Sequence, residues 1–229
     1  MIAVRIMIAE RPKPEPSVKL GIRERNKLER RARIVSAARA VFNEKGFAAA
    51  TTREIAERAN VGTGTVFLYA GDKRELLIMI INDELDAMNE RAVATVPRRA
   101  SLVTQLMHYF APQLRFWADD IALARLATAE THAALTRPRD GRAETERLHD
   151  RRIKTFAALT SLIAQAQLRN GLSPDCDPEL AAHLIFDIHI GENRKWLSGE
   201  HPTYEDAIER LRSVLTFALR GFGGTRASR

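Results

Sequence analysis

Apolar residues recur along most of the chain at the three- and four-residue spacing of amphipathic helices, without the alternation that is typical of a strand. The pattern predicts helices over roughly residues 28–45, 52–59, 63–69, 73–88, 102–117, 121–135, 143–170, 178–197 and 204–222. The sequence therefore indicates an all-α fold of about nine helices. Three of them form an N-terminal head, and six form a body.

Capping residues define the ends of the first helices. Gly46 stops the first helix, and Thr51 with Glu54 three positions later fits a capping box. Asn60 follows the second helix and tolerates the left-handed conformation that a helix-ending turn requires. Asp72 can cap the fourth helix. Two short helices joined by three or four residues are typical of a helix-turn-helix motif.

The longest apolar run, residues 76–81, is far shorter than the roughly 20 residues that a bilayer requires, so we expect no membrane span. Apolar residues on every side of this run predict a helix buried between two parts of the protein. Residues 1–9 make a poor signal peptide, which favours the cytoplasm. Three prolines in residues 10–20 predict an extended arm. We expect an arm over 1–27, a head over 28–75 and a body over 76–229.

The net charge of +7 is confined to the N-terminal third of the chain. Residues 1–77 contain 16 Lys and Arg against 9 Asp and Glu, whereas residues 78–229 contain 20 of each. Such asymmetry favours a basic end that meets a polyanion, with a solvated basic surface as the alternative. The single cysteine, Cys176, excludes an intrachain disulfide and zinc sites built from several thiolates.

Residues 51–77 read TTREIAERANVGTGTVFLYAGDKRELL. This segment, with the preceding helix, resembles the DNA-binding domain of the TetR family of bacterial transcriptional regulators over about 45 residues. Three positions depart from the family pattern. Phe67 replaces a common tyrosine and with it a phenolic phosphate contact, Ala70 replaces an aromatic residue, and Asn60 replaces a glycine.

The resemblance implies that the third helix enters the major groove of double-stranded DNA by its N-terminal end. Arg53 can reach guanine with a bidentate fork, or it can serve as a surface charge or phosphate contact. Tyr69 and Lys73 are candidates for phosphate contacts, with a core aromatic as the alternative for Tyr69. The basic residues 23–33 can track the DNA backbone or form a solvated tail. The predicted DNA-binding residues are Thr52, Arg53, Thr63, Gly64, Thr65, Phe67, Tyr69 and Lys73.

The body carries no motif, and its length and helix count agree with the family. One head reads few base pairs, so we expect a homodimer on a palindromic operator. The predicted interface comprises Leu184, Ile188, Leu211, Leu215 and Leu219, which can also pack within the monomer. The middle helices are expected to enclose a small-molecule effector, although aromatic residues at helical spacing are also typical of ordinary core. The candidate pocket residues are Phe110, Phe116, Trp117, His132, Phe156, Phe186 and His189.

We interpret the sequence as a ligand-responsive repressor that acts as a homodimer. We find no enzyme motif, and we expect no cofactor and no metal site. A nucleoid or division factor that binds many sites is one alternative. A helical enzyme or carrier is another.

Overall fold

The computed structural model describes residues 21–136, 139, 141–169 and 172–222. Helices α1–α3 are the head, α4–α9 are the body, and no strand occurs among these residues. The predicted all-α class is confirmed. The nine helices of this part of the chain are α1 (Ile22–Ala49), α2 (Thr52–Arg58), α3 (Thr63–Phe67), α4 (Lys73–Thr95), α5 (Leu102–Asp119), α6 (Ile121–Thr136), α7 (Ala143–Leu168), α8 (Pro178–Ser198) and α9 (Tyr204–Phe222).

Several predicted helix ends require correction. Helix α1 begins at Ile22 rather than near residue 28, so the end of the expected arm is helical, while residues 1–20 lie outside the described part. Gly46 interrupts helical geometry at φ 73°, a left-handed value that glycine adopts readily, as its predicted role as a stop requires. Helix α3 ends at Phe67 rather than Tyr69, and α4 continues to Thr95.

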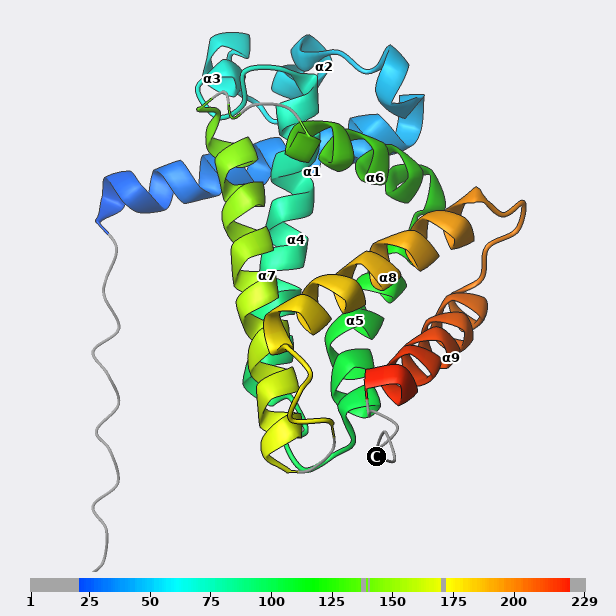
Figure 1. Cartoon of the computed structure of the whole chain (residues 1–229). Helices are drawn as coiled ribbons and strands as arrows, with labels where there is room; N and C mark the ends of the chain where they lie inside the picture. Colours follow the sequence, from blue (N-terminus) through cyan, green and yellow to red (C-terminus); the bar gives the residue numbers. More distant parts are fainter. Residues whose placement is uncertain (1–20, 137–138, 140, 170–171, 223–229) are drawn as a thin grey trace, which may run out of the picture.

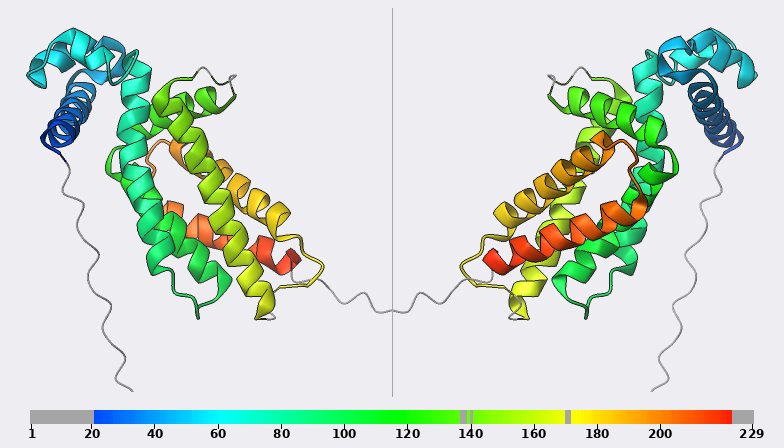
Figure 2. Two further views of the ribbon diagram at one scale, coloured as in Figure 1. Left: turned by 90° about the vertical axis from the view of Figure 1, so that its left-hand side faces the viewer. Right: turned by 90° about the vertical axis from the view of Figure 1, so that its right-hand side faces the viewer.

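The head lies at one end of α4, and α7 runs beside α4 along the body (Figure 1). Helices α8 and α9 pack against α7 and α5 on the side of the body away from α1 (Figure 2). This arrangement places α4 and α7 between the head and the C-terminal helices.

One hydrophobic cluster joins the head to the body. It contains Ile34, Ile55 and Val66 of the head, each 0% exposed, together with all residues of the α4 segment 76–81 except Ile78. Every residue of that α4 segment is at most 4% exposed, which confirms the predicted helix buried between two parts. Ala124 of α6 belongs to the same cluster. Because the head shares its core with α4 and α6, a movement of these helices moves the head.

A second cluster fills the body between α5, α7, α8 and α9. Leu211 and Leu215 of α9 are 1% and 0% exposed there, so the predicted placement of these two leucines on a dimer surface is wrong. The helical stripe of α9 is satisfied within the chain by α5.

Candidate nucleic-acid interface and internal cavity

Helix α2 begins with the predicted capping box. The Oγ1 atom of Thr51 accepts from the Glu54 amide at 3.2 Å, and the Thr51 amide donates to Oε2 of Glu54 at 3.0 Å. Lys45 of α1 also pairs with Glu54. The bonds from Lys45 and Thr51 hold the pKa of Glu54 at about 2, so this carboxylate stays charged and fixes α2 on α1.

The turn between α2 and α3 depends on Asn60, whose φ of 53° is the one left-handed value among the described non-glycine residues. The Val61 amide then donates to the Ala56 carbonyl at 3.0 Å and closes the end of α2. Asn60 thus performs the conformational role that the family usually assigns to glycine, as predicted.

Helix α3 is anchored on one side and open on the other. Val66 is 0% exposed and holds the helix on the head core. Thr63 and Gly64 at its N-terminus are exposed, Thr65 is half-buried, and the Phe67 ring is 49% exposed. No atom lies within 4 Å of a Cβ built on Gly64, so the backbone there is accessible to a partner.

Helix α2 contributes two further predicted residues beside α3. Thr52 is half-buried at the first position of the helix, and the Arg53 side chain is 82% exposed. The Nε atom of Arg53 donates to Glu57 at 3.0 Å. An exposed pair of this kind contributes little stability, so Arg53 can exchange Glu57 for a base or a phosphate.

Lys73 and Tyr69 both bond to backbone carbonyls of the head. The Lys73 ammonium donates to the carbonyl oxygens of Phe47, Ala48 and Ala50 at 2.7, 3.0 and 3.2 Å, which uses all three of its N–H groups. The Tyr69 hydroxyl donates to the Lys27 carbonyl at 3.2 Å. Both side chains fix α1 in this structure, and their predicted phosphate contacts stay predictions.

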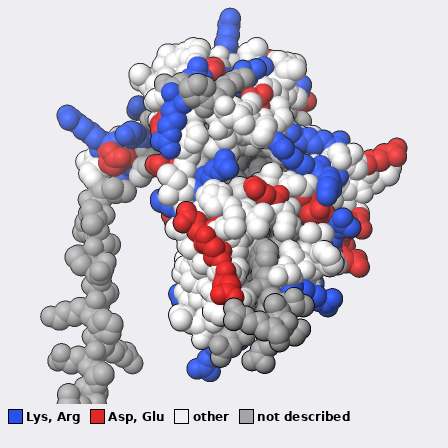
Figure 3. Space-filling model, viewed as in Figure 1, with Lys and Arg blue, Asp and Glu red and all other residues white. Residues whose placement is uncertain are grey.

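The basic residues of α1 project from the head along its N-terminal half (Figure 3). Arg31 differs from the others because it turns inward and pairs with Asp83 of α4 and Glu144 of α7. Nothing in the sequence marks this difference, because Arg31 stands within a run of similar residues. The exposed members are Arg23, Arg25, Lys27, Arg30 and Arg33.

An internal cavity of about 110 Å³ lies between helices α4 to α8. Trp117, Phe186 and His189 line it, as predicted. Phe110 stacks on the His189 ring with centroids 4.1 Å apart, and Phe156 lies 5.0 Å from Phe186, so these two support the wall from behind.

Two predicted pocket residues do not line this cavity. Phe116 packs on the cluster that joins the head and body, and His132 is exposed on α6. The missed lining residues are mainly polar, and their periodicity resembles that of surface positions. They include Asn89, Gln113, Arg151, Arg152, Thr155 and Asn193.

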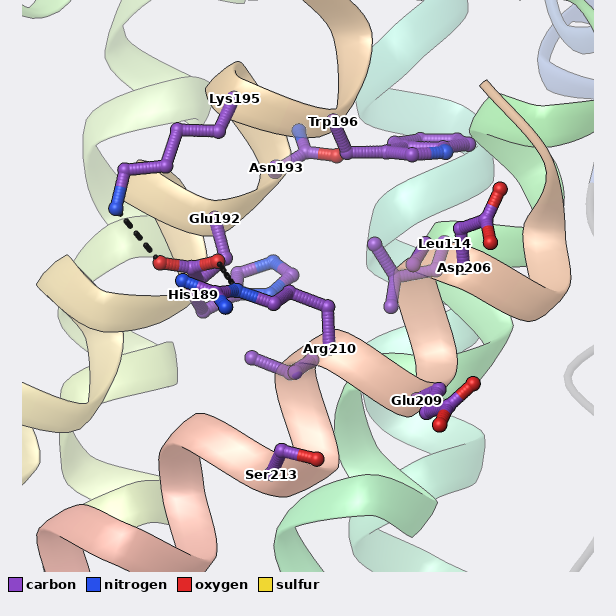
Figure 4. A pocket seen from close by; sticks show the side chains of 12 residues that line it. Leu114, His189, Glu192, Asn193, Lys195, Trp196, Asp206, Glu209, Arg210 and Ser213 are labelled. Atoms are coloured by element: carbon purple, nitrogen blue, oxygen red, sulfur yellow. Dashed lines mark hydrogen bonds and ion pairs between the residues drawn. The ribbon is translucent and has the colours of Figure 1, made fainter. Parts of the chain in front are cut away.

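A second, more open cavity of about 620 Å³ lies between α8 and α9 (Figure 4). Glu192 of α8 accepts from Arg210 of α9 and from Lys195 on its own helix, each at 2.8 Å. His189 and Asn193 line both cavities and therefore form the wall between them.

The remaining predicted dimer residues lie at or near the surface. Leu184 is 44% exposed, and Ile188 and Leu219 are half-buried. Leu180 and Phe217, at 59% and 79%, are more exposed apolar side chains of the same two helices. In the described residues, no group of three or more His, Cys, Asp or Glu side chains is placed to hold a metal ion. Within the same described residues, no helix is both long enough and apolar enough to cross a membrane.

These features define a helix-turn-helix protein whose head shares its core with a helical body. Residues 34–80 match the model of the family described as bacterial regulatory proteins, tetR family. The HTH-type transcriptional regulator BetI of Burkholderia mallei (strain NCTC 10229) is 30% identical over 166 residues, which cover 68% of this chain and 80% of BetI. The chain belongs to the TetR family, and its relatives are transcriptional regulators.

Two further similarities are more distant. The HTH-type transcriptional regulator HbdR of Aromatoleum sp. (strain CIB) is 28% identical over 134 residues, which span 57% of this chain and 58% of HbdR. The crystal structure of FadR from Bacillus subtilis in complex with stearoyl-CoA has a TM-score of 0.65 at 20% identity. That comparison covers 83% of this chain and 98% of FadR, and it shows a shared fold.

Proposed function

We propose that the protein is a ligand-responsive repressor that binds a palindromic DNA operator as a homodimer in the cytoplasm. The observation that carries the proposal is the shared core of the head and body. The open face of α3 belongs to the same packed unit as α4, which also lines the internal cavity. Occupation of that cavity can therefore change where the head lies.

The DNA-reading surface in this proposal comprises the exposed ends of α2 and α3. The N-terminus of α3, with Thr63 and Gly64, enters the major groove, where Thr65 supports the contact. Arg53 donates to a base edge, and Thr52 contacts the backbone. The exposed Phe67 ring offers an apolar contact, for which a thymine methyl group is a suitable partner.

Dimerisation in this proposal uses the outer faces of α8 and α9. Leu180, Leu184 and Phe217 expose apolar surface there and gain stability by burial against a second copy. Two heads held by this interface read two half-sites one or more helical turns apart, about 34 Å for one turn.

The effector in this proposal occupies the internal cavity. FadR of Bacillus subtilis was solved with stearoyl-CoA, which makes an acyl-CoA one effector class to test here. The cavity of about 110 Å³ is, however, smaller than the roughly 150 Å³ cavity that takes benzene in another protein. An effector that fits without rearrangement is therefore small.

The test is a titration of the full-length protein against DNA that flanks its own gene and against unrelated DNA of equal length, over a series of salt concentrations. We expect a sequence preference of at least about a thousandfold and an affinity that falls as salt rises. Arg53→Ala should weaken the specific complex about tenfold or more, whereas the matched control Arg115→Ala, on exposed α5 surface, should not. Equal affinity for both DNAs would sink the proposal.

A further inference from the structure

The lining of the internal cavity is cationic. It contains the guanidinium groups of Arg151 and Arg152, and its described members include no Asp or Glu. His189 adds no charge at neutral pH, because burial lowers its pKa to about 4. The wall therefore presents positive charge to whatever occupies the cavity.

Arg151 is buried, and its positive charge is only partly balanced by the acceptors around it. It is 8% exposed, and its hydrogen bonds to described residues run through Nη1 alone, to Oδ1 of Asn82 and, at 3.4 Å, to Oδ1 of Asp86. Asp86 is shared with Arg147, which donates to it at 2.7 Å. Burial lowers the pKa of Arg151 despite the opposing effect of Asp86, which shows that the charge is costly where it lies.

Arg152 has no ion pair with any residue that the structure describes. Its guanidinium lies over the rings of Phe156 and Phe186, with the carbon 5.5 and 5.9 Å from their centroids. Such contacts hold the group at the cavity wall but do not neutralise it.

Two buried polar atoms in the same wall are unpaired. Nδ1 of His189 and Oδ1 of Asn193 have no hydrogen-bond partner among the described residues, although the two residues are 3% and 5% exposed. An unpaired buried polar group costs about 1–3 kcal/mol, so such groups usually mark a missing water or ligand. Since the two orientations of an Asn amide are exchangeable, Asn193 can turn its NH₂ toward an acceptor.

The rest of the lining combines uncharged polar side chains with apolar ones, and the space is limited. Trp117, Leu135 and Leu148 contribute to it together with the ring of Phe186. The cavity of about 110 Å³ is smaller than the roughly 150 Å³ cavity that holds benzene in another protein, so an occupant that lies wholly inside it is no larger than benzene, with its six heavy atoms.

We propose that the internal cavity binds a short-chain carboxylate, with its carboxylate on Arg151 and Arg152 and its alkyl part against Trp117 and Phe186. This proposal rests on the proposed regulator function and names the effector class. The planar guanidinium of Arg151 matches a carboxylate in a bidentate arrangement, and Asn193 supplies a further donor.

The site is connected to the head by side chains that Arg151 already contacts. Asn82, whose Oδ1 accepts from Arg151, donates through Nδ2 to Oε2 of Glu144 at 2.9 Å. Oε1 of Glu144 accepts from Arg31 of α1 at 2.9 Å. A carboxylate that draws Arg151 away from Asn82 thus disturbs a pair that fixes α1, and we expect it to weaken DNA binding.

The experiment is isothermal titration calorimetry of the full-length protein with butanoate, which has six heavy atoms, and with its neutral isostere butanamide. We expect butanoate to bind with a dissociation constant below about 1 mM and butanamide to bind at least tenfold more weakly. Arg152→Gln and Arg151→Lys should each weaken butanoate by about tenfold. Lys154→Gln, an exposed neighbour on α7, should leave its affinity unchanged.

Equal affinity for butanoate and butanamide, or no butanoate binding by protein that still prefers its own DNA, would overturn the carboxylate site and leave the regulator function standing. Failure of the unliganded protein to prefer that DNA would instead contradict the regulator function. Unchanged butanoate affinity in both arginine variants would place the anion elsewhere and overturn the site.

Discussion

In the head, polar side chains face solvent, bond to nearby backbone or form ion pairs, whereas in the body charged side chains lie buried between helices. Lys73 closes the end of α1 with three carbonyl bonds, and Glu54 completes the cap of α2. In the body, Glu144 and Arg151 are only 7% and 8% exposed, and polar atoms of His189 and Asn193 are unpaired. Among the described residues, every buried polar side-chain atom of the head therefore has a partner, while the body retains unpaired groups that a ligand can satisfy.

Head and body share one hydrophobic core, and Leu76→Ala tests this sharing with the largest expected effect. Leu76 is 0% exposed in the joint cluster, and its truncation should cost about 3 kcal/mol. Urea denaturation should show one transition at a lower midpoint. Leu68→Ala is the control, since Leu68 is 84% exposed and should change little. Two separate transitions in the parent protein would break the comparison.

Arg31→Met tests the contact between head and body at the surface of that core. It leaves the buried Glu144 without its α1 partner and should cost about 2 kcal/mol, reduced by the partial exposure of the pair. Arg30→Met on exposed surface of the same helix is the matched control. If both variants unfold at the same urea concentration, the ion pairs of Arg31 do not hold the head.

A change of pH distinguishes the body from the head through His189. Its folded pKa of about 4 lies below the unfolded value near 6.5, so the unfolded chain binds the proton first as pH falls. The unfolding free energy that neutral His189 contributes is fully present above about pH 6.5 and declines toward pH 4. The decline between pH 7 and pH 5 is about 2 kcal/mol. Urea denaturation at pH 7 and pH 5 measures how much unfolding free energy each variant loses on acidification. This loss should be smaller for His189→Gln than for His132→Gln, which changes an exposed histidine. Equal losses would refute the assignment to His189.

The smallest expected effect concerns the turn of the head. At φ 53°, alanine lacks the short polar side chain that makes this conformation tolerable for asparagine, so Asn60→Ala should cost about 1 kcal/mol. Asn60→Gly should be neutral or slightly stabilising, because glycine adopts this conformation readily. Thermal unfolding of the two variants checks the sign. A more stable Ala variant would show that the turn does not impose this backbone conformation.

Sequence reasoning succeeded where structure is decided locally. The capping box at Thr51, the left-handed Asn60 and the buried run of α4 depend on neighbours within one or two helical turns. It missed contacts that depend on distant partners. The carbonyls that bind Lys73 lie 23 to 26 residues away in sequence, and the stripe of Leu211 does not reveal whether α5 or another subunit covers it.

The internal cavity was predicted only in part, for a related reason. Its aromatic residues, such as Trp117, are conspicuous in the sequence. Arg151 and Asn82 resemble ordinary surface residues, because only the packing of α7 on α4 buries them together. Buried charge is thus the feature of this body that periodicity misses.

The central claim is that two copies of the head, held by the body, read a symmetric DNA site. Hydroxyl-radical footprinting of the full-length protein on the DNA that flanks its gene tests it most directly. The account predicts two protected half-sites related by two-fold symmetry, with centres separated by one or more helical turns of about 10 base pairs. Protection of a single asymmetric site, or uniform protection along the fragment, would contradict it.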